Sequence, residues 1–488
     1  MTELYYSLMT AKNGSVIPVL KNGRTVDSKY NPQKEAESIL QGISCKTKYN
    51  YFIILGIGSG LFIKELSKKF GQSRIIAVER SEKDLDFLLQ IDTVKKLKDN
   101  ANVFFTSADK LSETVCSTYL PAKYEKPEII EQRAWKNENQ DIIELISSNI
   151  NKALRIISAD YSVQAHFGKI WMHNIMTNLQ LSEKKFEFQI DRSKKAAVLA
   201  AGPSLEKSIS KIIENKNSYF VIATDTALQA LIKYKCHPDA VISIDGQAVS
   251  REHFQNCPND SLYFFDLCAN PSAAKHIIKK GGKVIYFSSG HPLSSLASDF
   301  TDSLPHIFSG AGTVTIAAVD LAVKLGFEKI SVLGADFGFW EKAYTRGTYL
   351  HTLYSLSENK LQSLEKQYDR LMYRTPLIIT DEKKTTELLE AYRKSFLEYL
   401  SLNSIKYSYQ DNEYSLTSNA PSPQTFHSSS TFNFSAFLNY CKRSKAEELE
   451  IPLLPYVAYL KNRAAADSKF EYLDFLKLAH TFIVRYNN

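Results

Sequence analysis

Short apolar runs alternate with amphipathic segments of helical length along this chain, in two successive blocks. In the first block, the apolar run at residues 51–55 ends in closely spaced glycines, and an amphipathic segment follows at residues 61–70. A second apolar run occupies residues 75–78. A buried strand that turns through glycines into a helix is typical of a Rossmann-like unit. The pattern therefore predicts an N-terminal Rossmann-like domain over residues 1–155, in which residues 125–155 form a helical connector.

The second block is longer and occupies residues 160–410. Its short apolar runs, separated by segments long enough for helices, lie at residues 196–200, 219–223, 240–244, 262–265, 284–287 and 329–333. This order predicts a mostly parallel sheet that is covered by helices on both faces. We assign it to a central domain over residues 156–425.

The chain becomes rich in Ser, Thr, Asn and Pro after Asp411, which predicts a loop or linker. From residue 436 onward, apolar residues return at helical spacing and predict a C-terminal helical region over residues 426–488. The whole pattern predicts an α/β fold with two Rossmann-like parallel-sheet domains followed by helices.

The glycines of the first block are Gly56, Gly58 and Gly60, and Glu79 follows about 20 positions later. A carboxylate at that distance binds a ribose in dinucleotide-binding proteins. Glycines also let a strand turn tightly into a helix for packing reasons alone. The sequence leaves open whether this loop binds a nucleotide.

Small and polar residues follow the strands of the second block, at the sheet edge where open parallel sheets bind ligands. Gly202, Pro203 and Ser204 precede a predicted helix. Glycine permits close approach of the backbone, serine is a good helix cap, and the free N–H groups of the helix form an anion site. An ordinary strand-to-helix turn would show the same residues.

Two carboxylates follow the next two strands. Thr224 and Asp225 come after one strand, and Asp245 comes after the next. A parallel sheet brings them to one edge, where Thr224 or Asp225 could contact a ribose or base and Asp245 could orient an acceptor or bind a metal. Each aspartate could instead cap its helix.

Two further groups of candidates complete this edge. Gly310, Gly312 and Thr313 precede an almost wholly apolar helix pattern, which predicts a helix buried between layers. Asp336 follows the last strand of the block. The segment after it carries the richest set of acid–base groups in the chain, namely Tyr344, Arg346, Tyr349 and His351.

The amino-acid composition argues against several classes of function. Lys and Arg exceed Asp and Glu by 60 to 53 without a long basic run, so charge does not indicate a nucleic-acid partner. The six cysteines are scattered, without the spacing of a zinc site, and we predict no bound metal. No apolar run approaches the roughly 18 residues of a membrane helix, and the N-terminus lacks a leader pattern. We therefore expect a cytoplasmic protein without a membrane span.

Together, these segments resemble the motility-associated-factor family of bacterial flagellin glycosyltransferases and, more distantly, bacterial sialyltransferases that share its CMP-sugar domain. The matching segments are AVLAAGPSLEKSI, IATDTALQALI, DAVISIDGQ and SGAGTVTIAAVDLAVKLGFEKISVLGADF, with SKYNPQKEAES and GIGSGLFIKEL in the first block. The resemblance covers most of residues 28–360. It implies that the central domain is a sialyltransferase-like variant of the GT-A-like fold.

The resemblance implies transfer of a nonulosonic acid, of pseudaminic or legionaminic type, from its CMP conjugate to Ser or Thr of flagellin. This activity would serve flagellar assembly and motility, and it requires no cofactor. In this interpretation, Gly202, Pro203 and Ser204 cradle CMP, while Thr224 and Asp225 contact its ribose or base. Gly310, Gly312 and Thr313 would line the donor pocket. We leave open whether the chain forms a homo-oligomer.

CMP is a good leaving group, so its departure needs positive or hydrogen-bonding help at the phosphate more than a strong acid. The candidates for that help are Tyr344, Arg346 and Tyr349. The attacking hydroxyl needs a proton acceptor, and His351 is preferred because imidazole titrates near neutral pH. Asp245 and Asp336 are competing bases, and His291 is a weaker candidate.

The chain departs from the family pattern at two places. Ala201 stands where the related sialyltransferases have Asn, which puts one base or phosphate contact in doubt. Residues 417–419 are Thr-Ser-Asn where the motility family is expected to have Gly-Gly. Acceptor handling or donor closure would differ accordingly.

Two other functions stay open. A distant branch of the superfamily resembles archaeal pterin diphosphokinases, in which Mg²⁺ would be held by Asp225, Asp245 and Asp336. The second is a non-catalytic factor that binds flagellin during assembly.

Overall fold

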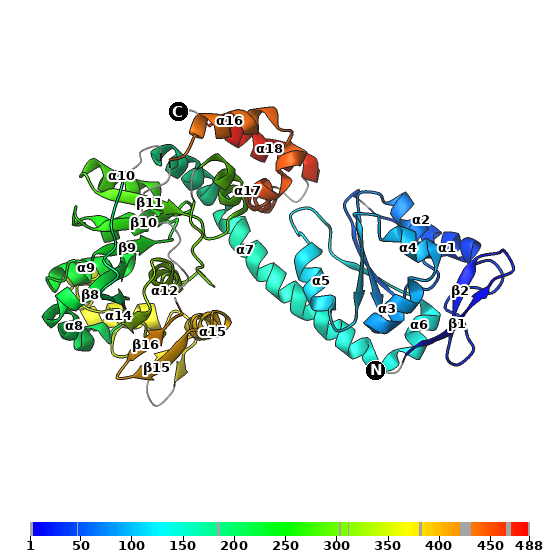
Figure 1. Cartoon of the computed structure of the whole chain (residues 1–488), viewed down its shortest axis with the longest axis horizontal. Coiled ribbons are helices and arrows are strands. Elements are labelled where there is room, and N and C mark those ends of the chain that lie inside the picture. Colours follow the sequence, from blue (N-terminus) through cyan, green and yellow to red (C-terminus); the bar gives the residue numbers. More distant parts are fainter. Residues whose placement is uncertain are drawn as a thin grey trace. The chain divides into compact units, whose positions relative to one another are not determined.

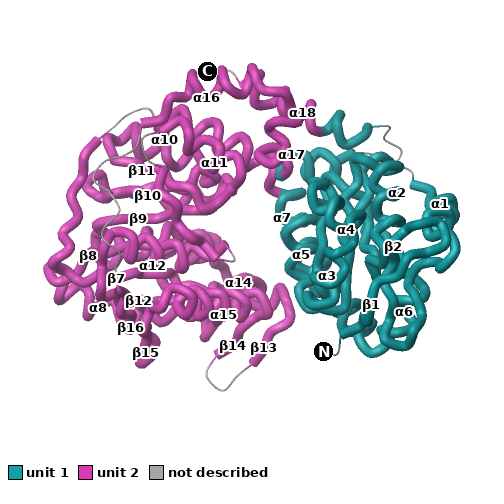
Figure 2. Tube along the Cα trace, turned by 45° about the vertical axis from the view of Figure 1, so that its right-hand side comes forward, with its two compact units in different colours: residues 1–166, 455–475 teal, residues 167–454, 476–488 magenta. Residues whose placement is uncertain are grey.

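The computed structural model describes residues 3–45, 47–182, 186–301, 304–310, 312–379, 383–419, 431–464 and 470–486. The chain divides into two compact units (Figure 2). Unit 1 contains residues 1–166 and 455–475, and unit 2 contains residues 167–454 and 476–488. All three boundaries between the units fall inside helices, namely α7 (Ile143–Leu181), α17 (Glu450–Arg463) and α18 (Tyr472–Val484). The predicted domain boundary at residue 155 also lies within α7 and stays a prediction.

Unit 1 is built on a parallel sheet of four strands in the order β5-β4-β3-β6. The strands are β3 (Tyr51–Leu55), β4 (Arg74–Glu79), β5 (Val103–Ser107) and β6 (Glu128–Glu131). All five residues of β3 are buried, as expected for a central strand with an apolar side chain on both faces. An antiparallel hairpin of β1 (Tyr5–Thr10) and β2 (Val16–Leu20) precedes this sheet.

Helices connect the strands of unit 1 (Figure 1). They are α1 (Pro32–Gln41), α2 (Leu61–Lys69), α3 (Glu82–Leu88), α4 (Asp92–Leu97), α5 (Leu111–Thr118) and α6 (Arg133–Glu138), followed by α7. Residues 125–155 were expected to be a helical connector. The structure corrects that expectation, since residues 128–131 form strand β6. The sequence pattern missed this strand because Glu-Ile-Ile-Glu holds only two apolar residues and lies at the exposed edge of the sheet.

Unit 2 contains an eight-stranded sheet in the order β11-β10-β9-β8-β7-β12-β16-β15. Its parallel strands are β7 (Lys195–Leu199), β8 (Tyr219–Thr224), β9 (Ala240–Ser243), β10 (Leu262–Asp266), β11 (Lys283–Phe287) and β12 (Lys329–Leu333). These six correspond to the six predicted apolar runs. Strand β16 (Glu413–Thr417) pairs antiparallel with β12, and β15 (Lys406–Gln410) pairs antiparallel with β16 at the edge of the sheet.

Strand β16 corrects the expectation of a loop directly after Asp411. Its side chains alternate between buried and exposed positions, so polar residues fill half of the strand and hide it from a search for apolar runs. The remainder of the predicted linker, residues 420–430, lies outside the described residues.

The helices of unit 2 cover this sheet (Figure 1). They are α8 (Leu205–Glu214), α9 (Asp225–Lys233), α10 (Pro271–Lys279), α11 (Pro292–Ala297), α12 (Val314–Lys324), α13 (Tyr349–Leu356), α14 (Leu364–Met372) and α15 (Glu387–Leu402). A small ladder joins β13 (Ile378–Ile379) to β14 (Lys384–Thr385). Helix α12 is buried from Thr315 to Val323 and contacts β7, β8 and β9, which confirms its predicted place between layers.

The predicted C-terminal helices are α16 (Phe434–Arg443), α17 and α18 (Tyr472–Val484). Among the described residues, no helix combines the length and apolar content that a membrane crossing requires. The fold is therefore an α/β architecture with two parallel-sheet bodies and C-terminal helices, as the sequence predicted.

Candidate functional site

A cavity of about 170 Å³ opens at the carboxyl edge of the parallel strands in unit 2. Strands β7, β8 and β12 each end at it, and the start of α12 forms another wall. Its polar lining comes from Thr224, Thr226, Thr313, Thr315, Asp336 and Tyr344, and Tyr392 of α15 also reaches it. The cavity therefore lies at the sheet edge where parallel strands bring together residues from distant parts of the sequence.

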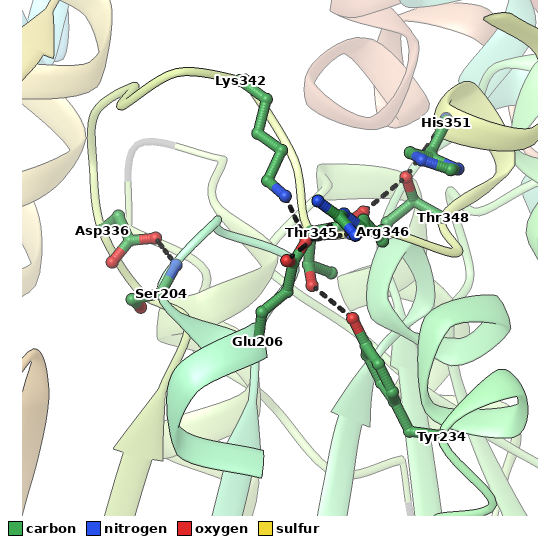
Figure 3. Close-up of polar contacts among 9 residues, drawn as sticks. All are labelled: Ser204, Glu206, Tyr234, Asp336, Lys342, Thr345, Arg346, Thr348 and His351. Atoms are coloured by element: carbon green, nitrogen blue, oxygen red, sulfur yellow. Dashed lines mark hydrogen bonds and ion pairs between the residues drawn. The ribbon is translucent and has the colours of Figure 1, made fainter. Parts of the chain in front are cut away.

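Asp336 occupies the anion site at the start of α8. Its Oδ2 accepts a hydrogen bond of 2.9 Å from the backbone N–H of Ser204 (Figure 3). A β-carbon at Gly202 would touch this carboxylate and would lie 2.5 Å from the carbonyl oxygen of Gly334. Gly202 is therefore required for the approach of the two strand ends, and a carboxylate of the protein itself takes the place of a bound anion.

The electrostatics of Asp336 follow from its surroundings. Burial raises the pKa of its carboxyl group, and the hydrogen bond from Ser204 opposes that rise. Ser204 occupies the N-cap position of α8, as predicted, but its side chain makes no cap hydrogen bond. Asp336 supplies the acceptor instead, because β12 lies next to β7 in the sheet.

Asp225 joins the ends of β8 and β9. Its Oδ1 accepts from the backbone N–H of Thr226 at 2.7 Å, and its Oδ2 accepts from the hydroxyl of Ser243 at 2.7 Å. The carboxylate is buried and does not line the cavity, whereas Thr224 and Thr226 do. Thr226 was not among the predicted residues, because nothing in the sequence distinguishes it from an ordinary residue in the first turn of a helix.

Asp245 lies near Asp225 at the same edge. Burial is the main cause that raises its pKa, and the charge of Asp225 adds to the effect. Its Oδ1 accepts a hydrogen bond of 2.9 Å from the backbone N–H of Gln247. Asp245 does not line the cavity.

The glycine-rich turn before α12 takes left-handed backbone conformations at Gly310 (φ +56°) and Gly312 (φ +84°). Thr313 caps the helix, accepting from the backbone N–H of Thr315 at 3.4 Å. Thr313 lines the cavity, while the two glycines shape the turn that delivers it. The turn therefore places the hydroxyl group of Thr313 and the N-terminus of α12 at the wall of the cavity.

The segment after Asp336 is tied to α8 by Glu206, which sequence reasoning missed. Lys342 Nζ lies 2.6 Å from Glu206 Oε1, and Arg346 Nε lies 3.6 Å from Oε2 (Figure 3). The backbone N–H of Arg346 also donates to Glu206 at 2.7 Å. Burial alone would raise the pKa of Glu206, but the contacts with Lys342 and Arg346 lower it. The predicted cation of this loop thus has an acidic partner within the fold.

The remaining predicted residues lie at different distances from the cavity. Tyr344 lines it, and burial raises the pKa of its phenol. Tyr349 begins α13 and meets the ring of His253 edge to face, with centroids 6.0 Å apart. His351 follows in α13, where Thr348 caps the helix by accepting from the backbone N–H of His351 at 3.3 Å. Neither Tyr349 nor His351 lines the cavity.

His351 still has an unused polar atom. Its Nδ1 is buried and has no hydrogen-bond partner among the described residues. Burial lowers the pKa of the imidazole, and the nearby Lys233 and Lys342 lower it further. The lowered pKa favours the neutral imidazole of His351. The other histidine candidate, His291, caps α11 through Nδ1, and partial burial lowers the pKa of its imidazole to about 3.

The chemistry of the site is that of hydroxyl groups, backbone N–H groups and one carboxylate. Such groups bind phosphates and sugar hydroxyls by hydrogen bonding. Because burial raises the pKa of Asp336, its carboxylate is a stronger proton acceptor than an exposed one. Among the described residues, no three His, Cys, Asp or Glu side chains are arranged to hold a metal ion.

Comparison with known proteins gives three findings. Residues 169–342 match a family model described as 6-hydroxymethylpterin diphosphokinase MptE-like. An uncharacterized protein of Treponema pallidum (strain Nichols) is 28% identical over 256 residues, covering 48% of this chain and 83% of that protein. A second uncharacterized protein of the same organism is 38% identical over 146 residues, covering 28% of this chain and 67% of that protein.

Among solved structures, the MAf glycosyltransferase from Magnetospirillum magneticum AMB-1 aligns with a TM-score of 0.50 and 11% identity. The alignment covers 99% of this chain and 91% of that one. This similarity extends over both units and confirms the fold that the sequence resemblance predicted.

Proposed function

The chain belongs to the same family as the 38% identical Treponema pallidum protein and has a glycosyltransferase-like fold, and on this premise we propose that it is a glycosyltransferase. It transfers a nonulosonic acid, of pseudaminic or legionaminic type, from its CMP conjugate to Ser or Thr hydroxyls of flagellin. The reaction takes place in the cytoplasm and requires no metal or cofactor.

One observation supports our assignment of the reacting groups. Asp336 lines the cavity and accepts a hydrogen bond from the backbone N–H of Ser204 at the N-terminus of α8. The anionic donor competes for the N–H groups after Gly202, and hydroxyls of Thr224 and Thr313 bind its polar groups. The carboxylate of Asp336 then leaves Ser204 and turns to the acceptor. Its raised pKa favours this exchange, because a buried carboxyl group with a raised pKa takes up a proton more readily.

The proposed transfer balances as follows. The acceptor oxygen bonds to the anomeric carbon, the bond from that carbon to the phosphate oxygen breaks, and CMP leaves with the electron pair. The acceptor proton passes to Asp336, while the phenol of Tyr344 donates a hydrogen bond to the departing phosphate. The lining position of both residues supports these roles.

His351 is the competing base, and Arg346 and Tyr349 are competing donors to the phosphate. None of these three residues lines the cavity, so the loop at residues 342–348 and the start of α13 would have to move for them to take part. Activity of Asp336→Asn and His351→Gln separates the two bases. If Asp336 is the base, its variant loses about a hundredfold or more in kcat, and the His351 variant keeps most of the activity.

The test of function uses purified full-length protein, a CMP-linked nonulosonic acid and flagellin, with intact-mass detection of the product. Wild type and the control Asp260→Asn, which changes an exposed aspartate, are expected to add the sugar mass. Asp336→Asn is expected to add it far more slowly. Equal rates for all three proteins would contradict the role of Asp336, and no product with any of them would contradict the transferase.

The MptE-like match supports a second candidate, a Mg²⁺-dependent pyrophosphoryl transferase acting on a pterin. Asp225, Asp245 and Asp336 would then be metal ligands. Asp225 is fully engaged by Thr226 and Ser243, and Asp336 by Ser204, so this function requires them to rearrange. Stabilisation by ATP with Mg²⁺ and not by CMP, together with loss of activity in EDTA, would favour the pterin enzyme.

A further inference from the structure

The glycine loop of unit 1 is filled by side chains of the protein. A β-carbon at Gly56 would lie 2.6 Å from Trp135 Cγ, and one at Gly58 would lie 2.7 Å from Asp27 Oδ2. Asp27 accepts hydrogen bonds from Ser59, from the backbone N–H at 2.8 Å and from the hydroxyl at 2.7 Å. The carboxylate thus accepts the hydrogen bond of the N–H group that would otherwise bind a nucleotide phosphate.

Glu79, at the position of a ribose-binding carboxylate, is also engaged. It is fully buried and accepts hydrogen bonds from Trp135 Nε1, the hydroxyl of Tyr5 at 3.0 Å and the backbone N–H of Ile57 at 3.3 Å. The loop that the sequence left open as a nucleotide site is therefore part of the core of unit 1.

Unit 1 has a separate groove of about 730 Å³. It is lined by α1, the end of β6, the start of α6 and the segment at residues 24–30. Its apolar lining includes Val26, Ile39, Phe62 and Ile130, and Arg24 and Arg133 also line it. This volume lies within the range of specific binding sites in proteins, which is roughly 300–1,000 Å³.

Strand β6 presents an open edge beside this groove. The backbone N–H of Gln132 donates to Leu55 at 3.0 Å, so by strand alternation the N–H and C=O groups of Ile129 and Glu131 face away from β3. No described strand pairs with β6 on that side. Ile129 is 47% exposed. Such an edge binds an added strand through the main chain.

The charged residues that line the groove determine which side chains an added strand should carry. Asp27 is satisfied by Ser59, Glu35 accepts from the backbone N–H of Ser28 at 2.6 Å, and Glu131 pairs with Lys136. In the described part of the chain, the guanidinium groups of Arg24 and Arg133 have no acidic partner. Lys29, which also lines the groove, donates to the carbonyl oxygen of Gly23 at 3.4 Å. The groove therefore offers the guanidinium groups of Arg24 and Arg133 beside its apolar residues.

We propose that this groove binds an extended polypeptide segment that alternates apolar and acidic residues, added as a fifth strand along β6. Its main chain bonds to Ile129 and Glu131, its apolar side chains face Ile39 and Phe62, and its carboxylates reach Arg24 and Arg133. The partner's identity as the acceptor protein rests on the proposed function, while the binding itself does not.

The test measures binding of a fluorescent peptide of about ten alternating glutamate and valine residues to the full-length protein. Ile129→Pro removes an outward N–H that the sheet of unit 1 does not use, and Ile129→Val keeps it. The proline variant is expected to bind at least about tenfold more weakly, and the valine variant within about twofold of wild type. If the two variants have equal melting temperatures and bind the peptide equally well, the proposal of an added strand along β6 is wrong.

Charge is tested separately. Arg24→Glu with Arg133→Glu is expected to weaken binding at least about tenfold, and the control Arg155→Glu on α7 is not. A peptide with lysine in place of glutamate is expected not to bind; if it binds equally well, the acidic specificity is wrong. No binding of the glutamate peptide to wild type would refute the groove.

The same proteins are also titrated with CMP, monitored by melting temperature. All groove variants are expected to respond as wild type does, because the proposed donor site lies in unit 2. Peptide binding without any response to CMP would count against the proposed function alone. A response to CMP without peptide binding would count against the groove alone.

Discussion

At the scale of single residues, the two carboxylates at glycine turns are the main finding. Asp336 bonds to the start of α8 beside Gly202, and Asp27 bonds to Ser59 beside Gly58. Each satisfies N–H groups that a bound anion would otherwise satisfy. They differ in what lies beside the turn, because the turn at Gly202 lines the cavity of unit 2, whereas Trp135 packs against the turn at Gly56 in unit 1.

The substitution Gly202→Ala tests whether the ends of β7 and β12 must approach each other closely. In Gly202→Ala, the new methyl group would press on Asp336 and on the carbonyl of Gly334. We expect a loss of about 1–3 kcal/mol in stability and a loss of donor binding at least about tenfold. Thermal unfolding and CMP titration measure the two effects. Gly71→Ala, where the β-carbon would make only an ordinary contact of 3.8 Å with the carbonyl oxygen of Ser67, serves as the control; unchanged CMP binding in Gly202→Ala would be evidence against the assigned site.

Glu79 gives a pH prediction. Burial raises its pKa to about 7 from an ordinary 4.5, so the folded state binds its proton more tightly than the unfolded state does. Its contribution to stability is therefore fully present below about pH 4.5 and is lost as the pH rises to 7 and above. The change is on the order of a few kcal/mol. Melting of unit 1 between pH 5 and pH 8 reports it.

Glu79→Gln cannot titrate, so the difference in stability between wild type and this variant is expected to shrink or reverse as the pH rises. Glu113→Gln, which changes an exposed residue of α5, is the control and should leave the pH dependence of wild type intact. A parallel pH dependence for wild type and Glu79→Gln would show that Glu79 keeps its ordinary pKa.

Sequence reasoning found residues at strand ends, and found them for a physical reason. Each buried strand is a continuous apolar run, so its end is visible, and parallel strands bring those ends to one edge. The pairing of Ser204 with Asp336, 132 positions apart, was not visible. It depends on β12 lying next to β7, and strand order is a property of the packed sheet that one sequence does not encode locally.

At the scale of elements, the loop between β12 and α13 is anchored on α8 by a single carboxylate. Glu206 holds both Lys342 and Arg346. Strands with few apolar residues were the ones that sequence reasoning missed: β6 holds two, and β16 alternates. Both lie at or near a sheet edge, where one side of the strand is exposed and polar residues are tolerated.

Glu206→Gln tests the anchoring of this loop. The partly exposed ion pairs contribute no more than about 1 kcal/mol to stability, so melting should change little. Release of the loop that carries Tyr344 is expected to weaken CMP binding by about threefold to tenfold, measured by calorimetry. Glu214→Gln, at the far end of the same helix, should bind CMP as wild type does; equal binding by both variants would exclude a role for the anchor.

At the scale of the whole molecule, the two parallel-sheet units use their glycine turns differently. In unit 2 the turn opens onto a cavity, and in unit 1 it is filled and a groove lies elsewhere. The sequence predicted both turns equally well, because it shows the glycines but not the side chains that come to fill the space beside them. Trp135 is 79 positions from Gly56 and reaches it only through the fold.

The central claim is transfer of a nonulosonic acid to flagellin through the cavity at Asp336. The most direct measurement is the intact mass of flagellin from cells in which this protein is wild type, absent, or replaced by Asp336→Asn. The account predicts that flagellin loses the mass of a nine-carbon acidic sugar, once or several times, in the absence of the protein and in the variant. Flagellin of unchanged mass in cells without the protein would contradict it.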